Sequence, residues 1–163
     1  MSENSGFKEV FSEYRVVVGF HEDSGVRISE VWFDAEGREH HPAGEPAIRQ
    51  WDFQGRLECE QYFRHGLEHR DGDHPAEIWY GSPKFPTQPT SKRWYKEGVQ
   101  YRAADLPSEM TIDPDTGISL FEITTDANGN YVKDLYRNPV SGEVIKDGHP
   151  KPRSSQAAFR HSK

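Results

Sequence analysis

Short runs of apolar and β-branched residues, separated by glycine-containing steps, follow one another along the chain. Residues 16–20 and 26–33 flank the sequence EDSG, and residues 48–53 and 56–63 flank a QG step. Between Leu57 and Tyr62 the side chains alternate, imperfectly, in the period of a strand with two unlike faces. Glycine in the connecting steps provides the positive φ that tight hairpins require. The pattern predicts an antiparallel meander of short hairpins and no helix of useful length.

Three segments repeat one pattern. They read EVWFDAEGREHHPAGEPAI from residue 30, EQYFRHGLEHRDGDHPAEI from residue 60 and KRWYKEGVQYRAADLPSEM from residue 92. Each has an aromatic pair, a glycine soon after it and a closing proline. The first aromatics of the pairs, Trp32, Tyr62 and Trp94, are 30 and then 32 residues apart. Periods in this range are typical of repeat proteins, so we expect tandem units of about 30 residues in an elongated all-β fold.

The repeat divides the chain into four parts. We expect an N-terminal hairpin in residues 1–29, a three-copy region in residues 30–110, further hairpins in residues 111–147 and a basic, disordered tail in residues 148–163. Residues 82–91, SPKFPTQPTS, form a Pro-rich insertion with a proline at every third position. That spacing matches polyproline II, and a stiff connector between the second and third copies is the expected role.

The repeated pattern resembles the variant MORN repeats of bacterial and phage proteins, which are often labelled antitoxin component. The resemblance is best seen in YFRHGLEHRDGDHPAEIWY and covers residues 30–110. It implies a ribbon of β-hairpins that works as an interaction or scaffold module, and it carries over no catalytic residue.

Charge is unevenly distributed. The chain has a formal net charge of −7, and residues 30–81 alone hold 12 acids against five arginines. This half would repel a phosphate backbone, so direct nucleic-acid binding is not expected. Cys59 is the only cysteine, which favours a reducing compartment and a packing role for its side chain. Neither a signal-like start nor a membrane-spanning window is evident, so a cytoplasmic location is expected.

Histidines suggest one candidate for chemistry. His65, His69 and His74 lie near two aspartates, and they are weak candidates for a metal site. In the third copy, Tyr101 replaces His69, and residues of a strand and turn lack the i, i+4 convergence of a helix. We therefore expect solvent-facing histidines produced by the repeat, no metal and no cofactor.

The predicted function is binding of another protein. The expected partner has a basic surface, and the chain would neutralise it as an antitoxin, an immunity protein or a phage-encoded inhibitor of host defence does. Aromatic and arginine side chains usually supply the decisive contacts of such interfaces. The residues expected to bind the partner are Trp32, Tyr62, Trp94, Arg70, Arg102, Glu58, Glu60 and Glu68.

Three alternatives remain open. An acidic mimic of nucleic acid could inhibit a nucleic-acid enzyme, although arginines interleave with the acids. A metal-assisted hydrolase could use the histidines. A structural component of an assembly, a homo-oligomer included, could pair its exposed sheet edges. For Arg70 and Arg102, stacking across neighbouring aromatics or pairing with acids on an adjacent strand is favoured over partner contact.

Overall fold

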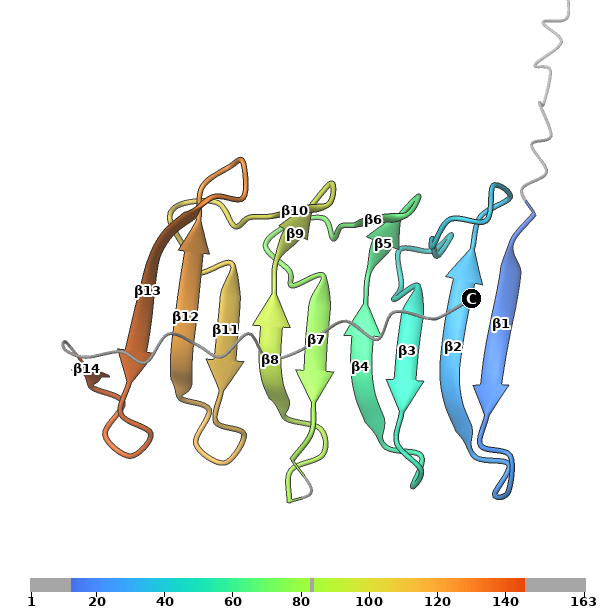
Figure 1. Ribbon diagram of the computed structural model, residues 1–163, viewed down its shortest axis with the longest axis horizontal. Helices are drawn as coiled ribbons and strands as arrows, with labels where there is room; N and C mark the ends of the chain where they lie inside the picture. The colour runs from blue at the N-terminus through green and yellow to red at the C-terminus, as the bar shows by residue number, and fades with distance from the viewer. Residues whose placement is uncertain (1–12, 83, 146–163) are drawn as a thin grey trace, which may run out of the picture.

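The computed structural model describes residues 13–82 and 84–145, which form one long antiparallel sheet with short hairpins at one end (Figure 1). Ten strands follow one another across the sheet in chain order, and each pairs with its neighbours in the antiparallel sense. The described residues contain no helix. The predicted all-β meander is confirmed. The strands of this sheet are β1 (Arg15–Phe20), β2 (Arg27–Phe33), β3 (Ile48–Trp51), β4 (Leu57–Gln61), β7 (Glu77–Tyr80), β8 (Pro89–Arg93), β11 (Glu109–Ile112), β12 (Ser119–Thr125), β13 (Tyr131–Arg137) and β14 (Val144–Ile145).

Three long loops leave the sheet at the same end (Figure 1). The first loop, residues 34–47, joins β2 to β3. The second, residues 62–76, joins β4 to β7 and contains the hairpin of β5 (Phe63–Arg64) and β6 (Leu67–Glu68). The third, residues 94–108, joins β8 to β11 and contains the hairpin of β9 (Tyr95–Lys96) and β10 (Val99–Gln100). We call the part of the molecule that these loops form the loop end.

The predicted polyproline connector is wrong for residues 89–91. These residues begin β8, which pairs with both β7 and β11. Residues 84–88 belong instead to the turn between β7 and β8, where the Phe85 N–H donates to Ser82 Oγ at 3.1 Å. Proline is tolerated at the first position of a strand, because the ladder loses little there. Pro83 and the predicted basic tail of residues 148–163 lie outside the described residues.

Ion pairs link neighbouring strands across both faces of the sheet. On one face Arg93 lies between Glu77 and Glu109, at 2.7 and 3.2 Å. Successive residues of a strand point to opposite faces, so Glu60 lies on the other side of the sheet from this row. There Arg49 lies between Glu30 and Glu60, at 3.4 and 3.5 Å. Such cross-strand pairs satisfy charges that the single layer only half covers.

The best-buried residues lie where the loops meet the sheet. Ala47, Ala76 and Ser108 close the three loops and have no exposed surface, and Tyr62 and Trp94 are nearly as well buried. Small side chains at these positions allow the loops to approach the adjacent strands closely. The core is therefore shallow and partly aromatic, which is what a chain poor in aliphatic residues can build.

Candidate functional site

Each of the three loops is closed by the same two backbone hydrogen bonds of a large aromatic residue, which begins the second and third loops and lies near the end of β2 before the first loop. In each, the N–H of the first large aromatic donates to the carbonyl of the small residue that closes the loop. The carbonyl of that aromatic accepts from a residue seven or eight positions later. The first contacts are Trp32 N to Ala47 O, Tyr62 N to Ala76 O and Trp94 N to Ser108 O, and the second are His40 N to Trp32 O, His69 N to Tyr62 O and Tyr101 N to Trp94 O, all between 2.7 and 3.0 Å.

Successive loops are joined to one another at their tips. Gly66 in the second loop donates its N–H to the carbonyl of Glu39 in the first, and Gly98 in the third donates to the carbonyl of Glu68 in the second, each at 2.9 Å. Both glycines have positive φ, 83° and 78°, a conformation that a residue with a side chain adopts only under strain. The loops therefore form a continuous row.

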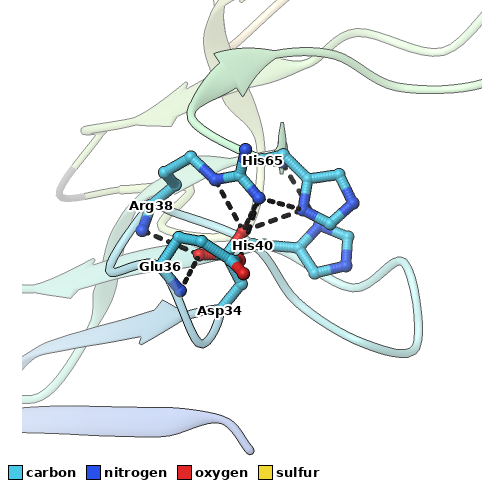
Figure 2. Close-up of polar contacts among 5 residues, drawn as sticks. All are labelled: Asp34, Glu36, Arg38, His40 and His65. Atoms are coloured by element: carbon cyan, nitrogen blue, oxygen red, sulfur yellow. Dashed lines mark hydrogen bonds and ion pairs between the residues drawn. The ribbon is translucent and has the colours of Figure 1, made fainter. Parts of the chain in front are cut away.

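Asp34 joins the first loop to the second (Figure 2). Its carboxylate accepts the N–H groups of Glu36 and Arg38, at 3.1 and 2.9 Å, and Arg38 Nε at 2.9 Å. His65, which stacks on His40 with ring centroids 4.1 Å apart, places Nδ1 2.8 Å from the same carboxylate. Burial alone would raise the pKa of Asp34, but the hydrogen bonds from His65 and Arg38 outweigh it and hold that pKa well below its usual range.

His69 joins the second loop to the third, and the expectation that it faces solvent is wrong. Its side chain is almost completely buried. Nδ1 accepts the N–H of Glu97 at 3.1 Å, so we assign the ring proton to Nε2, which lies 3.0 Å from an Asp71 carboxylate oxygen. The histidine is buried because it satisfies a backbone donor of the next loop, a contact between units that the pattern of one unit does not reveal.

Arginines stack on the buried aromatics. The Arg70 guanidinium lies 3.7 Å from the centroid of the Tyr62 ring, and that of Arg102 lies 4.1 Å from Trp94. Arg102 also forms a two-bond pair with Asp73, at 2.7 and 2.8 Å. These predicted contact residues thus build the loops, and the arginines cover the aromatic faces.

The Trp94 indole lacks a partner that other tryptophans of the sheet have. Trp32 Nε1 donates to Glu30 at 3.0 Å, and Trp79 Nε1 donates to a carboxylate that is likewise two residues earlier. Lys92 occupies that position before Trp94, and the Trp94 N–H is buried without an acceptor. An unpaired buried donor reduces stability.

Two open clefts separate the successive loops. The cleft between the first and second loops has a volume of about 350 Å³ and is lined by His41, Glu45, Tyr62 and Arg70 among others. The cleft between the second and third loops has a volume of about 290 Å³, and its lining includes Asp73, Trp94, Lys96 and Arg102. Each cleft has an aromatic wall, an arginine and carboxylates.

At the loop end, the carboxylates of the ion pairs are more exposed than their arginines, and the lysine of the third loop, Lys96, is exposed as well. The arginines with which they pair lie further in: the side chains of Arg38, Arg49, Arg64 and Arg102 are 47, 26, 40 and 17% exposed. The side chains of Glu36, Glu45, Asp71, Asp73 and Glu97 are 64, 60, 80, 58 and 52% exposed. Arginines therefore hold the carboxylates outward, on all three loops.

The remaining predicted residues are spread out. Glu60 lies on the sheet, where it accepts from Tyr80 Oη at 3.0 Å, and Glu58 is exposed on β4. Glu68 is half-buried, and burial, together with the like charge of Glu77, raises its pKa to about 7.

The predicted histidines do not come together as a metal site. His65 and His69 have the separate partners described above, and His74 lies beside Gly72 in the second loop. Among the residues that the structure describes, no group of three His, Cys, Asp or Glu side chains could hold a metal ion.

Asp34 is a residue that sequence reasoning missed, although a signal for it exists. The segment DAEGR at residues 34–38 has the same pattern as DFQGR at 52–56. Asp52 also accepts the N–H two residues on, at 2.9 Å, and the Nε of Arg56, at 2.6 Å. An aspartate three residues before a turn glycine and four before an arginine thus indicates a closed turn with a fixed carboxylate.

Comparison of the chain with protein-family models, with curated proteins and with solved structures finds no match. The resemblance to MORN repeats therefore stays a prediction. No helix within the described part of the chain is long and apolar enough to cross a membrane.

Proposed function

We propose that the chain is a non-enzymatic protein-binding module whose loop end binds a basic surface of another protein and neutralises it, as an antitoxin, an immunity protein or a phage-encoded inhibitor does. The observation that carries this proposal is the outward row of carboxylates on three hydrogen-bonded loops. A row of like charges on fixed loops attracts a surface of opposite charge and speeds its association.

The two clefts support a protein partner rather than a uniform polyelectrolyte. Each offers an aromatic wall and an arginine beside the carboxylates, so lysine or arginine side chains of a partner can enter between the loops. An acidic mimic of nucleic acid would need unbroken rows of carboxylates. Here Arg38, Arg49 and Arg64 stand among the acids and pair with them, which favours protein recognition.

The test is capture of a partner from the native host with two matched triple variants. The loop-end variant is Glu36→Gln, Glu45→Gln and Asp71→Asn. The control carries Asp23→Asn, Asp115→Asn and Glu143→Gln on exposed turns outside the loop end and has the same change in net charge. Circular dichroism first establishes that both variants fold.

We expect the wild type and the control to bind the partner and to inhibit its activity at a one-to-one ratio. The loop-end variant should bind about tenfold or more weakly, since each rim charge contributes up to about 1 kcal/mol, and the difference should shrink with added salt. Equal binding by both variants, or loss of binding in the control alone, would refute the role of the loop end. A captured protein whose activity is unaffected would refute neutralisation.

A further inference from the structure

The first strand of the sheet has an open, apolar edge. β1 pairs with β2 on one side, and no described strand covers its other side. The side chains of Val16, Val17, Val18 and Phe20 are all exposed, Val17 at 49% and Phe20 at 60%. Proteins that remain monomeric usually protect such an edge with lysine, proline or a bulge in the edge strand. From Val16 to Phe20 the strand contains no lysine and no proline. It contains no bulged residue either, because the extra residue of the β1–β2 bulge, Ile28, lies on β2.

The register of β1 shows which of its backbone groups are unpaired. Val16 lies opposite Trp32, whose N–H donates to Ala47 and thus points away from β1. In such a pair the backbone groups of both residues point away from each other. The N–H and C=O of Val16 therefore point outward from the sheet, and alternation extends this to Val18. The edge offers a regular series of donors and acceptors to another strand.

We propose that two copies of the chain pair through β1, antiparallel to each other, about a two-fold axis at Val17. The outward backbone groups of Val16 then meet those of Val18 in the second copy, and Val17 faces its own counterpart in a pair without direct hydrogen bonds. The two ten-stranded sheets become one continuous sheet.

The side chains are self-complementary in this register. Tyr14 lies opposite Phe20 of the second copy, so two exposed aromatics pair. Glu13 lies opposite His21, so no two like charges meet there. Arg15 lies opposite Gly19, where no side chain competes for its space.

Neighbouring registers that keep the outward groups paired are worse. An axis at Val18 places Glu13 opposite Asp23, so two carboxylates meet. An axis at Val16 places Tyr14 opposite Val18 and Glu13 opposite Gly19, and the pair of aromatic side chains is lost. The amino-acid order of this edge thus favours one alignment.

The opposite edge of the sheet is less suited to pairing. β14 covers β13 only at Tyr136 and Arg137, so the start of β13 is also uncovered by a described strand. That part of β13 contains Lys133 and Asp134, charges of the kind that discourage pairing. The second copy is therefore expected on β1. The two-fold axis uses the β1 edge of both copies, so the assembly stops at two chains. Because the two β1 strands are antiparallel, the two loop ends point in opposite directions.

The experiment measures the mass of the full chain in solution by sedimentation equilibrium and compares two lysine variants. We expect the wild type to be a dimer of 18.7 kDa chains. Val17→Lys brings two like charges together at the axis and should weaken the dimer by about tenfold or more. Val132→Lys, at a similarly exposed position on the other edge, should leave the dimer unchanged. A monomeric wild type, a polymer, or a dimer that persists in Val17→Lys would overturn the proposal.

Cysteine variants test the register itself. In pairs without direct hydrogen bonds the Cα atoms are about 4.5 Å apart, a separation that permits a disulfide. Val17→Cys should form a covalent dimer on mild oxidation, because the two cysteines lie opposite each other. Val18→Cys should not, because each Val18 lies opposite Val16 of the second copy and the two cysteines are too far apart for a disulfide. Cys59 is buried and does not interfere. Faster cross-linking of Val18→Cys than of Val17→Cys would exclude the axis at Val17.

Discussion

Replacement of Glu68 by glutamine should stabilise the protein at alkaline pH and have little effect in mild acid. The Glu68 carboxyl is half-buried in β6 beside the buried Glu77, and its pKa is raised from 4.5 to about 7, by burial first and by the like charge second. Between these two values the folded state holds a proton that the unfolded state has released. Stability therefore falls as pH rises through this interval. Glutamine has the same shape and no charge to lose.

The magnitude follows from the size of the pKa shift. One pKa unit corresponds to about 1.4 kcal/mol, and after allowance for solvent screening of a half-buried group we expect Glu68→Gln to gain about 1–2 kcal/mol near pH 8.5 and less than about 0.5 kcal/mol near pH 5. Urea unfolding followed by tryptophan fluorescence at both pH values measures these gains. Glu58→Gln, an exposed change of the same kind on β4, is the control. A gain that is equal at both pH values, or larger in acid, would refute this account of Glu68.

Three further outcomes are expected. Lys92→Glu should raise the free energy of unfolding by about 1 kcal/mol, because it places an acceptor two residues before Trp94; thermal unfolding that starts no later than in the wild type would contradict this. Gly129→Ala and Gly117→Ala both force a side chain into positive φ at a cost of about 1 kcal/mol, and Gly129→Ala should cost more in urea unfolding because its Cβ would lie 3.1 Å from a valine methyl group, whereas the other site is open. The Cys59 thiol, whose pKa burial raises, should resist a thiol reagent in the native protein and react as urea unfolds it; rapid native labelling would show that it is accessible.

The fold could be predicted from local signals. Turn glycines such as Gly37, Gly55 and Gly129 have positive φ in the structure, as tight turns require, and each lies between strands that the hydrophobic pattern had indicated. Local turn chemistry decides a meander because each strand pairs with the next one along the chain. The polyproline prediction was wrong at residues 89–91 because the spacing of the prolines was given more weight than the strand signal there. Pro89 is the first residue of β8.

The candidate site could be predicted only in part, because its contacts cross from one loop to the next. Arginine stacking on the aromatic side chains is a contact within one loop, and the repeated pattern indicated it. The burial of His69 depends on the N–H of Glu97, and the place of Asp34 depends on His65. No pattern within one unit encodes these pairs. The outward position of the carboxylates likewise depends on which arginines lie beneath them.

Each strand of the sheet pairs with the next one along the chain, and each loop of the row is hydrogen-bonded to the next loop, so the number of strands and loops can change without a change in the way that they join. A unit inserted between two existing ones would meet on each side the same kind of neighbour that is already there. It would add one more cleft between successive loops and leave the existing clefts unchanged. The length of the sheet can therefore change in steps of one loop and its two flanking strands, while the hydrogen bonds between neighbouring loops stay of the same kind.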